Sequence, residues 1–182
     1  GRIIIGTFAS QVNRIQKIFS LAEKFGRKIY LQGRSMNDNV EIAKQIGYMK
    51  FDAKTIINDS ELRHIPDNQV IILGTGAQGE NGAFLMKVVN NEHRVVKIKP
   101  GDTIIFSVIP GNERSIQSLT DQIVRQGGKV IHYEMMDVHA GGHAKQEDLK
   151  LMMRLLKPKY FMPIEGNHYM LQAHAELAQQ VG

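Results

Sequence analysis

Three short runs of this sequence are apolar at every position instead of alternating apolar with polar residues. They are Ile3-Ile4-Ile5, Val70-Ile71-Ile72-Leu73 and Ile104-Ile105-Phe106. Strands with this pattern are usually buried on both faces, as in a parallel sheet that helices cover from both sides. Segments with helical spacing separate these runs. We therefore expect an α/β fold with a doubly wound, mostly parallel sheet and helices on both faces.

Turn residues and apolar spacing divide the rest of the first 136 residues into further elements. Ser10 is expected to cap the first helix, which carries Ile15 and Phe19 and ends at Gly26. Further helices are expected over residues 39–46, through Leu85 and Val88, and through Ile116 and Ile123. Further strands are expected over residues 28–32, 69–75, 94–98, 102–108 and 129–133.

Glycine-rich and polar turns lie where several of these strands end. Doubly wound sheets bind ligands at the carboxyl ends of their strands. The turns concerned cover residues 7–10, 75–80 and 109–113. We therefore expect the functional site at this edge of the sheet.

The sequence changes in character from Asp137 onward. A loop of small residues with two histidines is followed by an expected helix, strand and helix over residues 146–156, 160–164 and 168–181. The first of these helices is amphipathic, and its inward residues are expected to be Leu149, Met152, Met153 and Leu156. The chain therefore divides into a domain over residues 1–136 and an αβα segment over residues 137–182.

The composition excludes several classes of protein. The 182 residues include no cysteine, which excludes a disulfide framework, a thiolate zinc site and a cysteine nucleophile. No apolar run approaches the roughly 20 residues that span a bilayer, so we expect no membrane-spanning helix. Lys and Arg number 23 against 18 Asp and Glu, a formal net charge of +5 that permits a polyanionic partner without requiring one.

The two ends of the sequence suggest a piece of a longer protein. The chain starts at Gly1, and Arg2-Ile3-Ile4-Ile5 already has the pattern of a strand, with no signal peptide. It stops at Gly182, directly after a helical pattern. We therefore expect part of a longer, cytoplasmic protein.

A glycine-rich turn follows the second apolar run. Gly74-Thr75-Gly76-Ala77-Gln78-Gly79 matches the G-x-G-x-x-G pattern of dinucleotide-binding turns. It is an internal turn, however, and no acidic residue ends the next expected strand to hold a ribose. We favour contact of the turn, at Gly76, with a phosphate over a nucleotide cofactor such as NAD or ATP. A tight turn that needs positive φ angles is the purely structural alternative.

A second candidate for phosphate binding follows the first strand. Thr7-Phe8-Ala9-Ser10 offers hydroxyl groups before a helix, and Arg14 lies one turn further on. Hydroxyls, free helix N–H groups and a guanidinium suit a phosphate of an RNA or DNA backbone. The structural alternative, which the sequence alone favours, is helix capping by Ser10 with Arg14 in solvent.

A third candidate is His139-x-x-x-His143 with Glu165 further along the chain. Two imidazoles and a carboxylate are metal-ligand types. Gly141-Gly142 lies between the histidines, so they do not share a regular helical face. One histidine could instead act as a general acid or bind a phosphoryl oxygen, and both could be ordinary loop residues.

A series of segments carries a family resemblance, and their order and spacing agree along essentially the whole chain. The first group comprises Thr7-Phe8-Ala9-Ser10, Arg14-Ile15-Gln16, Gly26-Arg27-Lys28, Gly33-Arg34-Ser35-Met36 and Thr75-Gly76-Ala77-Gln78-Gly79. The second comprises Lys99-Pro100-Gly101-Asp102, Ile109-Pro110-Gly111-Asn112-Glu113, Val138-His139-Ala140-Gly141-Gly142-His143-Ala144, Gln146-Glu147-Asp148-Leu149 and Pro158-Lys159-Tyr160-Phe161-Met162-Pro163. Together they resemble the bacterial ribonuclease J family, of the β-CASP group in the metallo-β-lactamase superfamily.

The resemblance implies a function in RNA processing and decay. Family members are endonucleases and 5′-to-3′ exonucleases with two metal ions, usually zinc, whose bound water attacks the phosphodiester. Residues 1–136 then correspond to the β-CASP domain and residues 137–182 to the return segment of the metallo-β-lactamase domain. RNA is the implied partner, and the full-length protein is expected to form a homo-oligomer or pair with a paralogous subunit, away from membranes.

The family's H-x-H-x-D-H metal motif lies upstream of the matching region, and nothing in this sequence matches it. We therefore expect this chain by itself not to cleave RNA.

The resemblance also implies roles for single residues. His143 corresponds to a histidine that contacts the scissile phosphate or assists as an acid near the leaving group. Glu165 stands where the family has a metal-ligating histidine, and a carboxylate there can still bind zinc or manganese. It implies either an altered metal preference or a non-catalytic or weakly active paralogue that binds RNA or a partner subunit.

The loop before His143 departs from the family in one position. Gly141 stands where the family often has a serine that helps to bind the 5′ phosphate of RNA. The lost hydrogen bond to a charged group is worth roughly 1.5–3 kcal/mol. The expected phosphate contacts are Thr7, Ser10, Arg14, Gly76, His139, Ala140 and Gly141.

Overall fold

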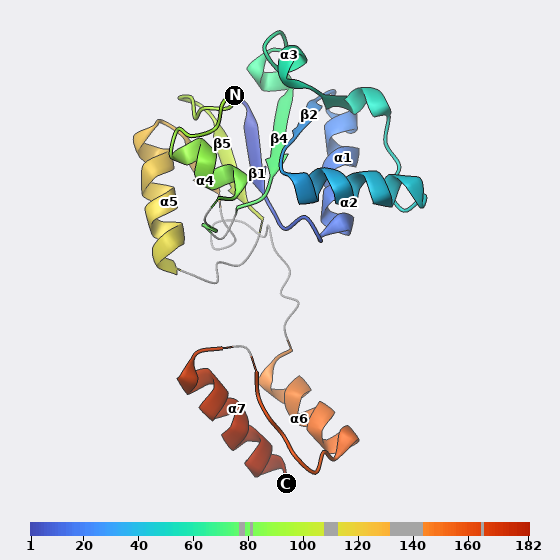
Figure 1. The fold of residues 1–182 in the computed structure, drawn as a ribbon, viewed down its shortest axis with the longest axis vertical. Helices are drawn as coiled ribbons and strands as arrows, with labels where there is room; N and C mark the ends of the chain where they lie inside the picture. The colour runs from blue at the N-terminus through green and yellow to red at the C-terminus, as the bar shows by residue number, and fades with distance from the viewer. Residues whose placement is uncertain (77–78, 81, 108–112, 132–143, 165) are drawn as a thin grey trace. The chain divides into compact units, whose positions relative to one another are not determined.

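The computed structural model describes residues 1–76, 79–80, 82–107, 113–131, 144–164 and 166–182 (Figure 1). The chain forms two compact units, Gly1–Ala140 and Gly141–Gly182. Among the helices in the described ranges, none combines the length and the apolar character that a membrane span requires.

A parallel sheet forms the centre of the first unit. Its described strands are β1 (Ile3–Gly6), β2 (Lys28–Leu31), β3 (Ile56–Ile57), β4 (Val70–Gly74), β5 (Thr103–Phe106) and β6 (Lys129–Ile131). They lie in the order β3-β2-β4-β1-β5-β6, and every pairing is parallel. Ile4 lies opposite Ile72 on one side and Ile104 on the other. The predicted parallel sheet of apolar strands is confirmed.

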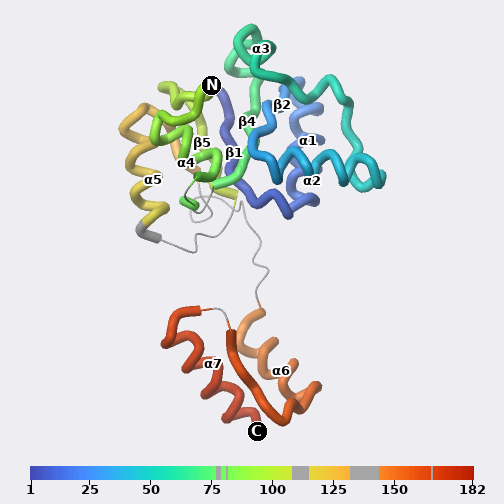
Figure 2. The backbone as a smooth tube through the Cα atoms, viewed as in Figure 1, coloured from blue at the N-terminus to red at the C-terminus, as the bar shows by residue number. Residues whose placement is uncertain are grey.

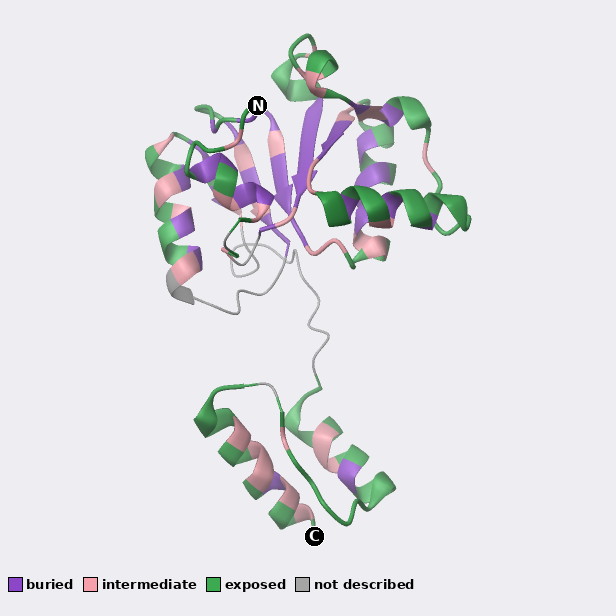
Figure 3. Cartoon of the chain, in the orientation of Figure 1, coloured by how far each residue is buried: buried purple, intermediate pink, exposed green. Residues whose placement is uncertain are grey.

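Helices cover both faces of the sheet, as the apolar runs predict (Figure 2). The helices of one face are α1 (Val12–Lys24) and α2 (Arg34–Gln45), and those of the other are α4 (Phe84–Val89) and α5 (Glu113–Arg125). Successive residues of β1 point to opposite faces, so Ile4 packs with the α4 and α5 side and Ile5 with the α1 and α2 side. All five residues of β4 are buried (Figure 3).

Short elements connect β2 to β4. They are the 3-10 turns η1 (Ala53–Thr55) and η2 (Asp67–Gln69) and the single-turn helix α3 (Asp59–Leu62). Asn58 caps α3, because its side chain accepts from the backbone N–H of Glu61 while the Glu61 carboxylate accepts from the N–H of Asn58. Asp59 also accepts a 2.6 Å hydrogen bond from the hydroxyl of Tyr30, which fixes this segment against β2.

The strand predicted over residues 94–98 does not form, and the prediction is wrong. Val96 and Ile98 are buried at 0% and 8% exposure in the core under α4, so their alternation reflects packing without a strand partner. The segment is fixed instead by Arg2 and Asp102, which are 4% and 2% exposed.

Arg2 and Asp102 form a two-pronged ion pair. Arg2 Nε donates to Asp102 Oδ1 at 3.0 Å, and Arg2 Nη2 donates to Oδ2 at 2.6 Å. Nη2 also donates to the carbonyl of Lys97 at 2.6 Å, and Asp102 Oδ2 accepts from the backbone N–H of Lys99 at 2.9 Å. These bonds take up backbone groups that a strand ladder would otherwise satisfy.

The second unit contains the two helices that the sequence predicts, α6 (Gln146–Leu156) and α7 (His168–Val181). The strand predicted over residues 160–164 is absent from the described residues between them. A strand needs a neighbour for its N–H and C=O groups, and the described residues of this unit supply no partner strand. Lys157, with φ of 43°, ends α6 in a left-handed conformation.

Much of the apolar surface of the second unit is exposed. Met153 and Leu177 are its buried hydrophobic residues among those described, and the predicted burial of Met152 and Leu156 is wrong, with exposures of 57% and 69%. The side chains are apolar as predicted, but α6 and α7 alone do not cover them. Further large exposed side chains are Leu151, Leu155, Tyr160, Met162, Ile164, Tyr169 and Met170.

The Arg2–Asp102 pair gives a direct test of what holds the first unit. Asp102→Asn keeps the shape but removes the buried counter-charge of Arg2, and the nearest remaining carboxylate is that of the half-exposed Asp67 at 3.9 Å. We expect it to lower the free energy of unfolding by about 3–5 kcal/mol in urea denaturation. The matched control is Asp121→Asn, which breaks the exposed pair with Arg125 and should cost no more than about 1 kcal/mol. Equal losses in both variants would contradict the assigned role.

Candidate functional site

The carboxyl edge of the sheet is a topological switch point. The chain leaves β1 and β2 for helices on one face and leaves β4 and β5 for helices on the other. Because β4 lies between β2 and β1, neighbouring strands send their helices to opposite sides. Ligands of doubly wound sheets bind in the crevice that this reversal creates. The predicted turns after β1 and β4 both lie at this edge.

Arg14 connects the ends of two strands across this edge. Its Nη1 donates to the carbonyl of Ser107 just after β5 and lies 3.5 Å from Thr7 Oγ1 just after β1. Partial burial lowers the pKa of the guanidinium. Thr7 is 1% exposed, and its N–H donates to the carbonyl of Gly74 at 3.0 Å. The predicted phosphate contacts of Thr7 and Arg14 stay predictions, and the structure gives both residues a role in joining β1, β4 and β5.

The predicted capping of α1 by Ser10 is wrong. Gln11 is the N-cap residue and makes no side-chain cap bond, while the Ser10 carbonyl accepts from the N–H of Val12 at 2.9 Å. Two hydrogen-bonded turns, from Phe8 to Gln11 and from Ser10 to Val12, turn the chain into the helix without a side-chain cap. Ser10 is exposed and therefore free of the structural role that its sequence position indicates.

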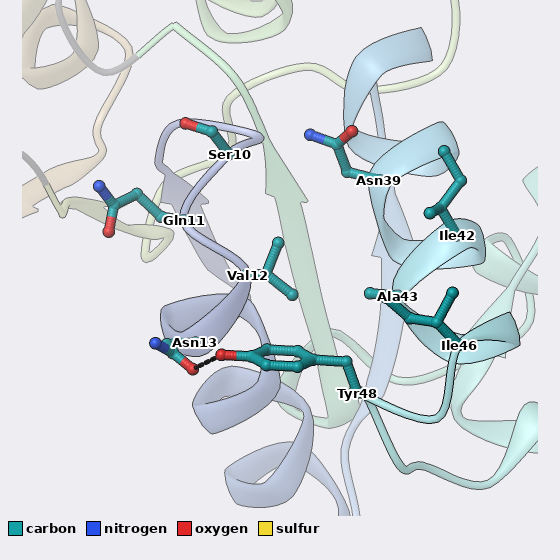
Figure 4. Close-up of a pocket in the computed structure, with 9 residues that line it drawn as sticks. All are labelled: Ser10, Gln11, Val12, Asn13, Asn39, Ile42, Ala43, Ile46 and Tyr48. Carbon is teal, nitrogen blue, oxygen red and sulfur yellow. Dashed lines mark hydrogen bonds between the residues drawn. The ribbon is translucent and has the colours of Figure 1, made fainter.

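Ser10 lines a pocket of about 530 Å³ between α1 and α2 (Figure 4). Apolar side chains make most of its wall, and the hydroxyl of Tyr48 donates to Asn13 Oδ1 at 2.7 Å across it. No charged residue lies among its described lining, which comprises Ser10, Gln11, Val12, Asn13, Asn39, Ile42, Ala43, Ile46 and Tyr48. This pocket therefore lacks the charge that a phosphate requires.

At each glycine of the G-x-G-x-x-G turn, an added side chain would crowd a neighbouring group. A Cβ on Gly74 would lie 2.3 Å from the Phe84 ring, and one on Gly79 would lie 2.9 Å from Ser115 Cβ. Gly76 has φ of +104°, and a Cβ there would lie 3.1 Å from the backbone nitrogen of Leu85. The pattern therefore needs no bound dinucleotide to account for it, and the phosphate contact at Gly76 stays a prediction.

A second pocket, of about 540 Å³, lies where β2 and β4 end. Sequence reasoning did not single it out, although Gly33-Arg34-Ser35-Met36 at its rim was part of the family resemblance. Its described lining is Gln32, Gly33, Arg34, Ser35, Thr75, Gly82, Ala83, Phe84, Lys87 and His93. These residues come from α2, the β4–α4 turn, α4 and the segment after it, which no spacing rule brings together.

His93 is held in one protonation state at the base of this second pocket. Its Nδ1 accepts from the backbone N–H groups of Val95 and Val96 at 3.2 and 3.0 Å, so Nε2 carries the proton and faces Gln32 Oε1 at 3.2 Å. The imidazole also packs edge-on against Phe84. Burial lowers the pKa of His93; the Asp59 carboxylate opposes this shift, and the positive charges nearby add to it. It is therefore a neutral donor that orients Gln32.

Comparison with known proteins identifies both parts of the chain. Residues 1–123 match the family model described as "Ribonuclease J, beta-CASP domain", and residues 130–182 match "Zn-dependent metallo-hydrolase RNA specificity domain". This chain belongs to the ribonuclease J family. The family resemblance and the fold that it implies are confirmed. The boundary between residues 136 and 137 stays a prediction.

Curated ribonuclease J family proteins align over the whole chain. "Ribonuclease J 1" of Streptococcus pyogenes serotype M3 is 44% identical and "Ribonuclease J" of Helicobacter pylori strain B128 is 39% identical. "Ribonuclease J2" of Bacillus subtilis strain 168 is 37% identical. All of this chain aligns with each, and it spans 33%, 27% and 33% of their respective lengths.

Several expected ribonuclease J family site residues lie outside the described residues. They are His139, Ala140, Gly141, His143 and Glu165, and their roles stay predictions. Within the described ranges, no three His, Asp or Glu side chains gather closely enough to hold a metal ion.

The crowding around Gly76 in the β4–α4 turn predicts that one added methyl group there lowers stability. Gly76→Ala should lower the free energy of unfolding by about 2–3 kcal/mol, because Ala is strained at positive φ and crowds Leu85. Gly82→Ala is the control, since Gly82 also has positive φ but no described atom lies within 4 Å of its added Cβ. We expect about 1 kcal/mol there in the same urea titration. A Gly76→Ala variant as stable as the wild type would refute this account.

Proposed function

We propose that this chain forms the RNA-binding wall and the late active-site segment of a metal-dependent ribonuclease that processes and degrades RNA. The observation that carries the proposal is the succession of a ribonuclease J β-CASP domain and an RNA specificity domain of a zinc-dependent metallo-hydrolase along one chain. In the full-length protein we expect endonuclease and 5′-to-3′ exonuclease activity, as implied by the family.

The net charge of the chain and the topology of its first unit support a polyanionic substrate. The net charge of +5 attracts a phosphate backbone without fixing its sequence. Ser10 and Gly76 follow strands that end at the carboxyl edge of the sheet, and the exposed Arg34 and Lys87 line the pocket where β2 and β4 end. Contacts of this kind position an RNA strand. Cleavage then depends on the catalytic groups beside the bound phosphate.

The proposal assigns the metal to residues shared with the rest of the full-length protein. Glu165 would supply one ligand, and the other ligands would come from segments upstream of this sequence. Bound zinc or manganese supplies a Lewis acid and an activated water. His143 would contact the scissile phosphate or protonate the leaving oxygen.

Replacement of His143 tests the proposed chemistry. In the full-length protein, His143→Ala should lower the rate of RNA cleavage far more than RNA affinity, because the residue acts on the reacting phosphate. Single-turnover cleavage and binding of the same labelled RNA give the two quantities. The control is His64→Ala, since His64 is exposed and contacts the carbonyl of Ser60 in its own turn. Unchanged cleavage by His143→Ala would remove the assigned role.

A second candidate function is a weakly active or non-catalytic paralogue that binds RNA or a catalytic partner subunit. Glu165, in the position of the family's metal-ligating histidine, favours it. If the ribonuclease proposal holds, Glu165→His should preserve or raise cleavage in zinc. Cleavage by the two full-length proteins is compared at matched zinc and manganese concentrations. RNA binding without cleavage in either protein would favour the paralogue.

A further inference from the structure

We propose that the pocket at the carboxyl ends of β2 and β4 is a phosphate subsite, in which Arg34 and Lys87 bind a phosphate of the RNA strand. The inference rests on the proposed function and adds a binding position to it. The pocket has about 540 Å³, enough for a phosphate with its ribose. It lies between α2 on one face of the sheet and α4 on the other, at the switch point.

The two charged residues of the described lining, Arg34 and Lys87, are both positive. Arg34 at the start of α2 and Lys87 in α4 are both exposed, and neither side chain has a hydrogen bond or ion pair with another described residue. No acidic residue is among the described lining. Lys99 and Arg94 of the same unit, by contrast, pair with Asp67 and Asp59. Two unpaired cations on one concave surface favour an anionic ligand.

The backbone around the pocket adds to this preference. α2 begins after Gly33, which has φ of +101° and offers no side chain to cap the first turn. The first N–H groups of this twelve-residue helix therefore have no side-chain cap, and the helix dipole adds positive potential. A Cβ on Gly33 would lie 3.6 Å from Thr75 Oγ1, so the start of α2 and the end of β4 border the same space.

Two polar residues of the lining, Gln32 and His93, are hydrogen-bonded to each other. The Nε2–H of His93 holds Gln32 Oε1, while Gln32 Nε2 donates to the carbonyl of Leu31 at 3.0 Å. Because both Nδ1 contacts of His93 come from backbone N–H groups, the imidazole stays neutral. The positive charge of the described lining therefore comes from Arg34 and Lys87.

The same chemistry would suit a phosphodiester of RNA or free inorganic phosphate. We assign the RNA strand, because Thr75 in the lining of the pocket directly precedes Gly76, where a phosphate contact is expected. Contacts by Lys and Arg to an RNA backbone have a measurable signature. Each removed contact lowers the slope of log affinity against log salt concentration by about 0.7 for a single strand.

The experiment measures RNA binding by the full-length protein and its Arg34→Ala, Lys87→Ala and double variants. A single-stranded RNA is titrated at several salt concentrations. Each single variant should bind about three- to tenfold more weakly, with a salt slope lower by about 0.7. Lys17→Ala is the matched control, because Lys17 is exposed on α1 and also lacks a described partner. The Lys17→Ala variant should have the RNA affinity and the salt slope of the wild type. Thermal unfolding confirms that every variant folds.

The outcomes separate this inference from the proposed function. If the wild type binds RNA and the double variant binds it with the same affinity and salt slope, the subsite is wrong and the proposed function stands. If the wild type does not bind RNA, the proposed function itself fails. Calorimetry with inorganic phosphate distinguishes a site for an RNA phosphodiester from a site for free phosphate. Heat of phosphate binding that is lost in the double variant, with RNA binding unchanged, would overturn the assignment to RNA.

Discussion

The buried pair between Arg2 and Asp102 is the interaction on which the arrangement of the sheet depends. Both side chains are almost fully removed from water, and such a pair is stable only when its remaining hydrogen-bonding groups are satisfied. The carbonyl of Lys97 and the N–H of Lys99 satisfy them here. The pair therefore fixes the amino ends of β1 and β5 and also the irregular segment that leads into β5.

Fixing one edge of a parallel sheet also fixes the other. The register runs without a break from Ile3 opposite Thr103 to Gly6 opposite Phe106. A shift at Arg2 would therefore move the carboxyl ends, where Arg14 joins the turn after β1 to the carbonyl of Ser107. The expected phosphate contacts follow these ends directly. The geometry of the candidate site is thus set from the opposite edge of the sheet, through backbone pairing.

The sequence predicts the elements whose signal is local. Apolar runs and helical spacing locate β1, β4 and β5, and the bounds of α6 and α7 agree with the prediction. The prediction of an element fails where residues distant in sequence determine the local structure. The strand expected around Val96 and Ile98 is an example, because these residues pack under α4 without pairing with another strand. Ser10 was misassigned because backbone turns start α1 without a side-chain cap. The pocket at Arg34 and Lys87 was missed because its lining comes from segments far apart in sequence.

The second unit shows what a pair of helices requires in order to fold. Met153 and Leu177 are its buried hydrophobic residues among those described, whereas Leu155, Tyr160 and Met162 are largely exposed. Two such side chains cannot offset the conformational entropy of ordering α6 and α7. By this argument, α6 and α7 need a further apolar surface over them to be stable. Released alone, a segment with this much exposed apolar surface would be prone to proteolysis and aggregation.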